Sequence, residues 1–138
     1  DVTITRQART TVAKTETGNT EMGRKSIIPY GLYRADGYIS ANLAQKVTGF
    51  SEEDLDLLWE AIINMFENDR SAARGKMCVR ALYVFKHDTE MGNAPAHILF
   101  DKIKISKKEG VVSPRSFDDY TVEVDKNMPD GVHFTEMI

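Results

Sequence analysis

The sequence predicts an α+β fold in which an antiparallel sheet carries helices on one face. Two-residue alternation of apolar side chains predicts strands near both ends of the chain, and helical periodicity predicts helices between them. Turn signals rich in glycine, asparagine and proline separate these segments. We expect the 138 residues to form a single domain over residues 1–138.

The N-terminal region is predicted to begin with a strand over residues 2–12, where apolar and polar residues alternate. Residues 14–22 are polar and contain a Gly-Asn turn signal, so they are predicted to form an exposed loop or the tip of a long hairpin. A second strand is predicted over residues 26–34. Pro29 lacks an amide donor, which places this strand at a sheet edge or beside a bulge.

Residues 23–40 admit two interpretations. They combine three basic residues and three tyrosines with three glycines and a proline. Tyrosines stack on bases, and Arg and Lys bind phosphates, so this composition suits a nucleic-acid surface. Tyrosine also favours strands, and aromatic strands mostly belong to the core. The composition by itself favours a core strand, with Tyr30 or Tyr33 as its buried member.

Two helices are predicted after this strand. Ser40 caps a short helix that ends at Gly49, and Ser51 opens a longer one in which Ser51 and Asp54 resemble a capping box. The apolar residues of the longer helix recur at helical spacing and are expected to face the core. They are Leu55, Leu58, Trp59, Ile62, Met65 and Phe66.

Residues 76–86 form the clearest predicted strand, in which Cys78 is interpreted as a small buried hydrophobe. A helix is predicted to follow over residues 93–102, with Asn93 as its cap and Pro95 in its first turn. Three short strands complete the chain, and a Pro-Asp-Gly turn separates the last two. They span residues 103–107, 120–125 and 132–137.

The net charge of −3 is distributed unevenly along the chain. Residues 1–40 and 71–108 carry net charges of +2 and +5, whereas residues 41–70 and 109–138 each carry −5. Two basic blocks separated by an acidic helix allow a locally basic face on an acidic protein.

No apolar run approaches the roughly 20 residues of a membrane helix, and the N-terminus lacks the features of a signal peptide. A single cysteine allows no internal disulfide, so a cytoplasmic location and no membrane partner are expected. The chain starts within a strand-forming segment rather than with Met, so we expect a fragment of a longer protein.

The histidines are too far apart in sequence to predict a metal site. His87, His97 and His133 are not spaced by one helical turn, and one cysteine cannot complete a zinc site, so no metal or cofactor is expected. His87-Asp88 resembles a general base with an orienting carboxylate, although a solvated strand end explains the pair more simply.

The strongest local candidate for binding is the basic connection that follows the long helix. Its residues suit phosphate groups, and a basic helix C-terminus that complements the helix dipole is an equally good explanation. The candidate residues are Arg70, Ser71, Arg74 and Lys76.

Seven blocks resemble one known family in their order along the chain. They are residues 22–25 (MGRK), 28–34 (IPYGLYR), 50–54 (FSEED), 69–75 (DRSAARG), 85–88 (FKHD), 92–97 (GNAPAH) and 114–120 (PRSFDDY). They look like the type I-C CRISPR-associated backbone protein (the Csd2/Cas7 family), the subunit repeated along the guide RNA in the Cascade surveillance complex. The resemblance covers nearly the whole chain.

The resemblance implies an RRM-like (ferredoxin-like) palm with insertions and several copies wrapped around CRISPR RNA (crRNA) without sequence preference. The implied partners are crRNA, further copies of the chain, other Cascade subunits and, through the guide, target DNA, all in a prokaryotic cytoplasm. The resemblance does not imply catalysis, because the maturation nuclease is a different subunit. Family members are much longer and carry an Asn-Pro-Asn-Gly-Asp stretch without a counterpart here, so the chain corresponds to a C-terminal portion.

The family's RNA contacts correspond to two places in this sequence. Residues 12–26 have the position of a thumb-like hairpin that displaces one base at intervals, with Met22 as its apolar wedge and Arg24 and Lys25 on the RNA backbone. At the palm, the resemblance assigns phosphate contacts to Arg70 and Arg74.

Two other functions are compatible with the residues. One is a metal-independent RNA endonuclease on a similar fold, which would use His87 or His97 with a nearby Tyr or Lys. The other is a protein-interaction module in which the acidic helix around residues 52–60 binds a basic partner.

Overall fold

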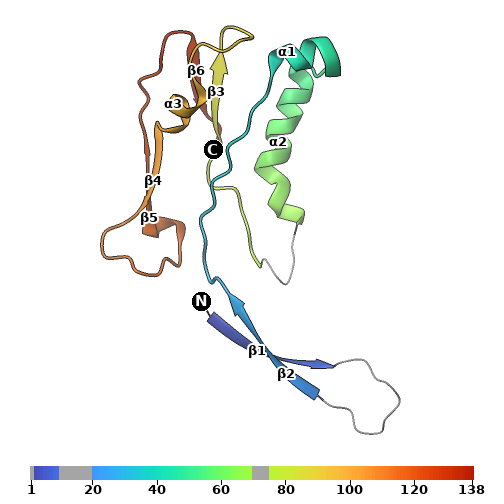
Figure 1. Cartoon of the computed structure of the whole chain (residues 1–138), viewed down its shortest axis with the longest axis vertical. Helices are drawn as coiled ribbons and strands as arrows, with labels where there is room; N and C mark the ends of the chain where they lie inside the picture. The colour runs from blue at the N-terminus through green and yellow to red at the C-terminus, as the bar shows by residue number, and fades with distance from the viewer. Residues whose placement is uncertain (1, 10–19, 70–74) are drawn as a thin grey trace. The chain divides into compact units, whose positions relative to one another are not determined.

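A computed structural model describes residues 2–9, 20–69 and 75–138, with side chains from residue 27 onward. The chain divides into two compact units, which we call unit 1 (residues 1–34 and 105–121) and unit 2 (residues 35–104 and 122–138). Figure 1 shows the order of helices and strands along the chain. The predicted α+β class is confirmed, and the described strands form three two-stranded antiparallel sheets, consistent with part of an RRM-like fold. The single domain stays a prediction.

Unit 1 contains a hairpin of β1 (Val2–Arg9) and β2 (Thr20–Ile27). Its antiparallel register runs from the pair Val2–Ile27 to the pair Arg9–Thr20. The predicted second strand over residues 26–34 is wrong, because β1 offers no partner beyond Ile27 and Pro29 has no amide donor to extend the pairing. The hairpin itself was one of the two arrangements predicted for this region.

Residues 28–34, which follow β2, have no regular secondary structure. This segment contains Tyr30 and Tyr33, and the structure shows which of the two is buried. The Tyr30 ring is half-buried and lies 6.1 Å from the ring of Tyr120, whereas the Tyr33 side chain is 81% exposed. Tyr30 is therefore the packed residue of the pair. Tyr120 begins β5 (Tyr120–Val124), which follows the 3-10 helix η2 (Phe117–Asp119) and pairs with β4 (Ile103–Lys107).

The first two helices of unit 2 begin at the predicted caps. In the first, Oγ of Ser40 accepts a hydrogen bond from the amide of Leu43 at the start of α1 (Ala41–Leu43). A π-helical turn, η1 (Ala44–Thr48), continues α1 and ends at Gly49, whose φ of 68° suits glycine. The longer helix, α2 (Glu52–Asn68), starts with the predicted capping box, in which Ser51 and Asp54 bind each other's backbone amides.

The apolar stripe of α2 is less buried than predicted. Its residues are half-buried or exposed, and Met65 remains 49% exposed. None of the α2 side chains is fully buried, so the described chain covers this face only in part.

The sheet of unit 2 pairs β3 (Tyr83–His87) with β6 (Val132–Glu136) in antiparallel register. The predicted strand over residues 76–86 is confirmed only at its end, where β3 pairs with the five residues of β6 and the amide of Met137 donates to the carbonyl of Leu82. Burial still alternates along this segment, and Cys78 lies on its outward side. Cys78 is exposed, so its predicted burial is wrong.

The described core lies in unit 2. Among the residues whose side chains are described, the buried apolar ones are Leu99, Ile103 and Val132. Leu99 belongs to α3 (Ala96–Phe100), which is shorter than predicted and starts after Pro95 rather than at an Asn93 cap. A row of ring contacts joins Phe100 to Phe85, Phe85 to Phe134 and Phe134 to Tyr83, with centroid separations of 5.4 to 6.5 Å.

The Pro-Asp-Gly turn before β6 forms as predicted. The amide of Val132 donates to the carbonyl of Pro129, and Gly131 has a φ of 75°. The strands on its two sides do not pair with each other, because β5 pairs with β4 and β6 pairs with β3.

Candidate nucleic-acid interface

The predicted thumb residues lie on β2 rather than in a loop. Met22 is opposite Gln7, Arg24 is opposite Thr5 and Lys25 is opposite Ile4. Consecutive strand positions belong to opposite faces, so Arg24 and Lys25 are on different faces of the hairpin. Residues 12–19 of the predicted thumb are outside the described residues.

The predicted palm contacts fall in a different unit. Arg70, Ser71 and Arg74 are outside the described residues, but Lys76 is described and exposed at the start of the extended segment that leads to β3. The backbone at Gly75 has a φ of 67°, which glycine tolerates best. The predicted thumb residues therefore belong to unit 1, and the predicted palm residues belong to unit 2.

The two units carry opposite net charges. Unit 1 has nine basic and six acidic residues, for a net charge of +3, whereas unit 2 has nine basic and fifteen acidic residues, for a net charge of −6. Counting charge in consecutive blocks obscures this division, because residues 105–121 join the N-terminal region only in the folded chain. A polyanion is attracted more strongly to unit 1.

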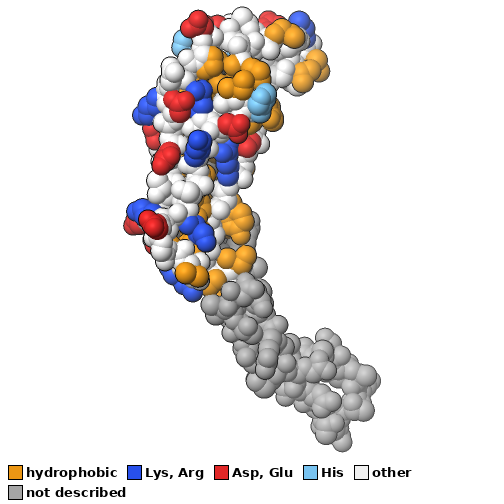
Figure 2. Space-filling model, turned by 60° about the vertical axis from the view of Figure 1, so that its left-hand side comes forward, with side chains coloured by type: hydrophobic (Ala, Val, Ile, Leu, Met, Phe, Trp, Pro, Cys, Tyr) orange, Lys and Arg blue, Asp and Glu red, His pale blue; other side chains and the backbone are white. Residues whose placement is uncertain are grey.

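Several cations of unit 2 have carboxylate partners. Lys102 Nζ lies 2.8 Å from Asp125 Oδ2, and its side chain is only 15% exposed. This hydrogen bond, followed by one from the Asn127 amide, lowers the pKa of Asp125 below its ordinary value. On the face in Figure 2, Lys and Arg side chains alternate with Asp and Glu in the described part, without a continuous basic patch.

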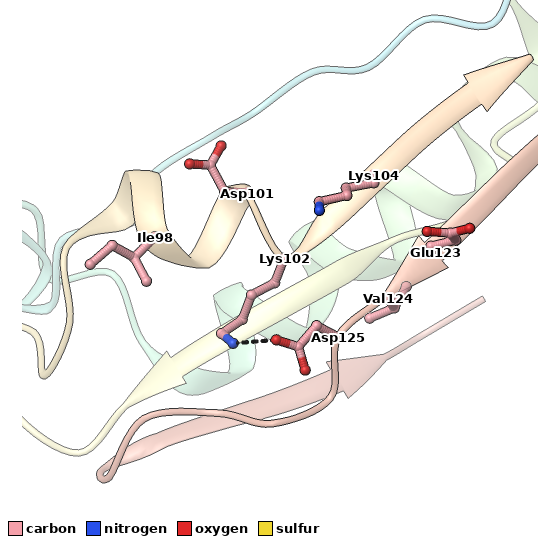
Figure 3. Close-up of a pocket in the computed structure, with 7 residues that line it drawn as sticks. All are labelled: Ile98, Asp101, Lys102, Lys104, Glu123, Val124 and Asp125. Carbon is pink, nitrogen blue, oxygen red and sulfur yellow. Dashed lines mark hydrogen bonds and ion pairs between the residues drawn. The ribbon is translucent and has the colours of Figure 1, made fainter.

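An open groove of about 400 Å³ in unit 2 has charges of both signs (Figure 3). Its lining residues are Ile98, Asp101, Lys102, Lys104, Glu123, Val124 and Asp125. Three carboxylates against two ammonium groups give this groove no preference for phosphate, so it does not extend the predicted interface.

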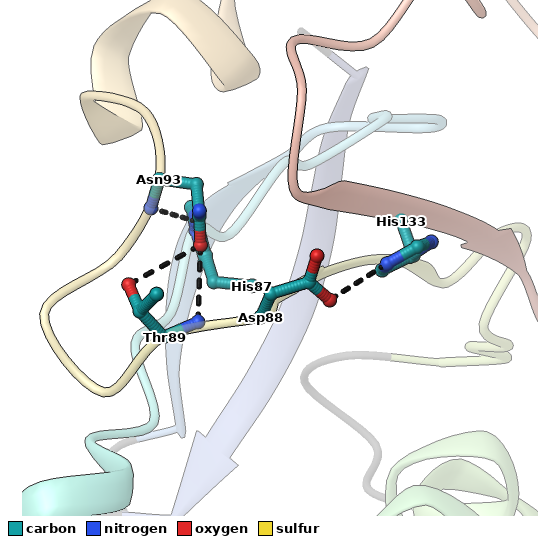
Figure 4. Close-up of polar contacts among 5 residues, drawn as sticks. All are labelled: His87, Asp88, Thr89, Asn93 and His133. Carbon is teal, nitrogen blue, oxygen red and sulfur yellow. Dashed lines mark hydrogen bonds and ion pairs between the residues drawn. The ribbon is translucent and has the colours of Figure 1, made fainter.

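A polar cluster at the end of β3 has a different pairing from the one predicted (Figure 4). Asp88 Oδ1 lies 2.8 Å from Nε2 of His133, and no hydrogen bond joins it to His87. The proposed His87–Asp88 dyad is therefore wrong. His87 Nδ1 instead accepts the backbone amide of Asn93 at 2.9 Å, which requires that this nitrogen carry no proton.

Asn93 closes the loop after β3 instead of capping α3. Its Oδ1 accepts hydrogen bonds from the amide and the hydroxyl of Thr89, at 3.1 and 3.3 Å. A side chain at Gly131 would collide with the Asn93 amide, so this glycine leaves room for the loop. The cluster is explained by loop closure, and among the described residues no group of His, Cys, Asp and Glu has metal-ligating geometry.

Residues 1–125 match the family model described as CRISPR-associated protein Cas7. The chain belongs to this family. At the family level, Cas7 proteins serve CRISPR defence as an RNA-binding backbone of the effector complex. A comparison with curated proteins finds no match.

Membership of the Cas7 family suggests why the charges of the two units differ. A protein that binds RNA needs basic side chains for the phosphates, and unit 1 is the unit in which basic residues outnumber acidic ones. The sequence predicted Arg24 and Lys25 as RNA contacts, which stays a prediction, and it did not reveal that both belong to the basic unit. None of the helices in the described part has the length and apolar character to span a membrane.

Proposed function

We propose that the chain is the C-terminal part of the backbone subunit of a type I-C Cascade complex. Several copies bind side by side along one crRNA, contact other Cascade subunits and, through the guide, engage target DNA. The observation that carries the proposal is the net charge of +3 on unit 1 of a chain whose family binds RNA. Arg24 and Lys25 lie on a strand of the hairpin in this unit.

Binding through phosphates explains why the subunit needs no sequence preference. Contacts from Arg and Lys to phosphate fix position without reading bases. Arg24, Lys25, Arg70 and Arg74 supply these contacts, with Met22 as the wedge between bases and Ser71 and Lys76 beside the palm phosphates.

The subunit acts without catalysis in this proposal. Support comes from His87, since its Nδ1 accepts a hydrogen bond from the Asn93 amide that closes the loop after β3. A general base would need this nitrogen available to the substrate.

Replacing Arg24, Lys25, Arg70 and Arg74 with Glu tests the RNA interface. We expect weaker binding to every RNA sequence and a salt dependence of affinity that falls by roughly one unit of slope for each lost phosphate contact. Lys126→Glu is the matched control, because Lys126 is an exposed cation of unit 2 whose partner is Glu136 at 3.7 Å. Unchanged affinity and slope in the fourfold variant would contradict the assignment.

Light scattering with and without crRNA tests assembly, and RNA-dependent growth to a defined multimer is expected. Incubation with CRISPR repeat RNA in EDTA tests the absence of catalysis. Cleavage that His87→Ala abolishes would establish the endonuclease alternative instead.

A further inference from the structure

The Tyr33 side chain is the most exposed aromatic group described in unit 1, at 81%. One side of its ring nevertheless lies against the backbone. A Cβ atom at Gly31 would be 2.9 Å from Cε2 of the ring and 3.2 Å from Cζ, so the ring occupies the space that a side chain at Gly31 would need. The ring thus rests on Gly31 and offers most of its surface to solvent.

Gly31 leaves space for the ring because it has no side chain. Its backbone is not among the left-handed glycines of the described chain, so the absence of a side chain, rather than conformational freedom, makes room for the ring. Contact with Gly31 covers one side of the ring and leaves the rest of the ring available to a ligand.

The chemistry of a supported, exposed tyrosine in a basic unit fits a nucleobase. We propose that Tyr33 stacks on a base of single-stranded RNA that follows the β1–β2 hairpin. This inference rests on the proposed function and adds a contact to the bases that phosphate binding does not provide. Stacking accepts every base, because each has a π face, so the contact preserves binding without sequence preference.

Tyr38 provides a natural control within the same chain. It is 77% exposed, nearly as much as Tyr33, but it belongs to unit 2, whose net charge is −6. Its ring meets Phe100 edge-on, at a centroid separation of 5.4 Å and an interplanar angle of 64°. Tyr38 therefore matches Tyr33 in exposure and differs in support and electrostatic surroundings.

Affinity for oligoadenylate, and for an RNA of equal length made of abasic residues, tests the stacking contact. Tyr33→Ala is expected to weaken oligoadenylate binding about 5- to 150-fold with an unchanged salt slope, since no charge is lost. It should leave abasic RNA binding unchanged. Tyr33→Phe should bind like the parent chain, Gly31→Ala should lose part of the affinity by displacing the ring, and Tyr38→Ala should have no effect.

Other results overturn the inference in distinguishable ways. If the parent chain binds oligoadenylate with a normal salt slope and Tyr33→Ala binds equally well, stacking is absent while the proposed function stands. An equal loss for abasic RNA would show that Tyr33 acts on folding, and a smaller assembly with unchanged RNA affinity would assign the ring to a protein contact. A parent chain that binds no RNA at low salt overturns the proposed function itself.

Discussion

Unit 1 and unit 2 differ in what holds them together and in what they attract. The three buried apolar side chains described belong to unit 2, together with the row of aromatic contacts and a net charge of −6. Unit 1 has a net charge of +3, a strand hairpin and an exposed tyrosine, and its described side chains from residue 27 onward include none of the three. The comparison teaches that the described core and the surplus of positive charge belong to different parts of this chain.

Removing core volume from unit 2 should have the largest effect on stability. Leu99 is 2% exposed, so Leu99→Ala is expected to lower the free energy of unfolding by about 2–5 kcal/mol. Urea unfolding followed by the fluorescence of Trp59, the single tryptophan, reports on this unit. Leu57→Ala is the control, since Leu57 is 64% exposed on α2 and should change stability by less than about 0.5 kcal/mol. Equal effects of the two variants would show that α3 does not anchor the unit.

Charge reversal in unit 1 should weaken RNA binding more than the same change in unit 2. The double variant Arg24→Glu and Lys25→Glu is expected to cost about 2 kcal/mol of binding free energy, as typical for lost charge-assisted hydrogen bonds. Reversal of Arg70 and Arg74 should cost less, because unit 2 already repels a polyanion. Titration of a fluorescent RNA at several salt concentrations measures both. A larger loss from the Arg70 and Arg74 pair would reverse the comparison.

Acid should weaken both units only slightly. Each unit contains a Ser-x-x-Asp turn in which backbone hydrogen bonds lower the pKa of the carboxyl group: Ser51 donates to Asp54, and Arg115 and then Ser116 donate to Asp119. A lowered folded-state pKa means that the unfolded chain binds more protons. The stabilisation is therefore complete above the unfolded value of about 3.9 and is lost as the pH falls through the folded value.

Carboxyl NMR shifts followed from pH 6 to pH 2 measure both groups. Asp54 and Asp119, like Asp125, should titrate below the ordinary value of an aspartate, and Asp54→Asn and Asp119→Asn should each remove one of these low-pH steps. Titration of either group at its ordinary value would show that its turn is open in solution.

Local features were predictable because neighbouring residues form them. Ser40, Gly49 and the Ser51–Asp54 box mark the helix ends at the predicted places, and the turn after Pro129 forms as expected. Their hydrogen bonds join atoms within a few residues of each other, so the sequence contains all the necessary information.

Features that depend on distant partners were predicted less well. The position of β2 follows from its pairing with β1, the length of β3 follows from β6, and the partner of Asp88 is on a strand 45 residues away. For the predicted binding site, the sequence shows which residues are basic. It did not show that residues 22–25 belong to a strand, in which consecutive residues lie on opposite faces.

The sequence by itself determined the α+β class, the caps and turns, and a Cas7-like order of motifs, because these depend on residue type and short spacing. Only the tertiary structure decided that Tyr30 packs while Tyr33 is exposed, and that residues 105–121 join the basic N-terminal region in one unit. Burial and net charge of a unit are sums over segments distant in sequence, so they exist only once the chain has folded.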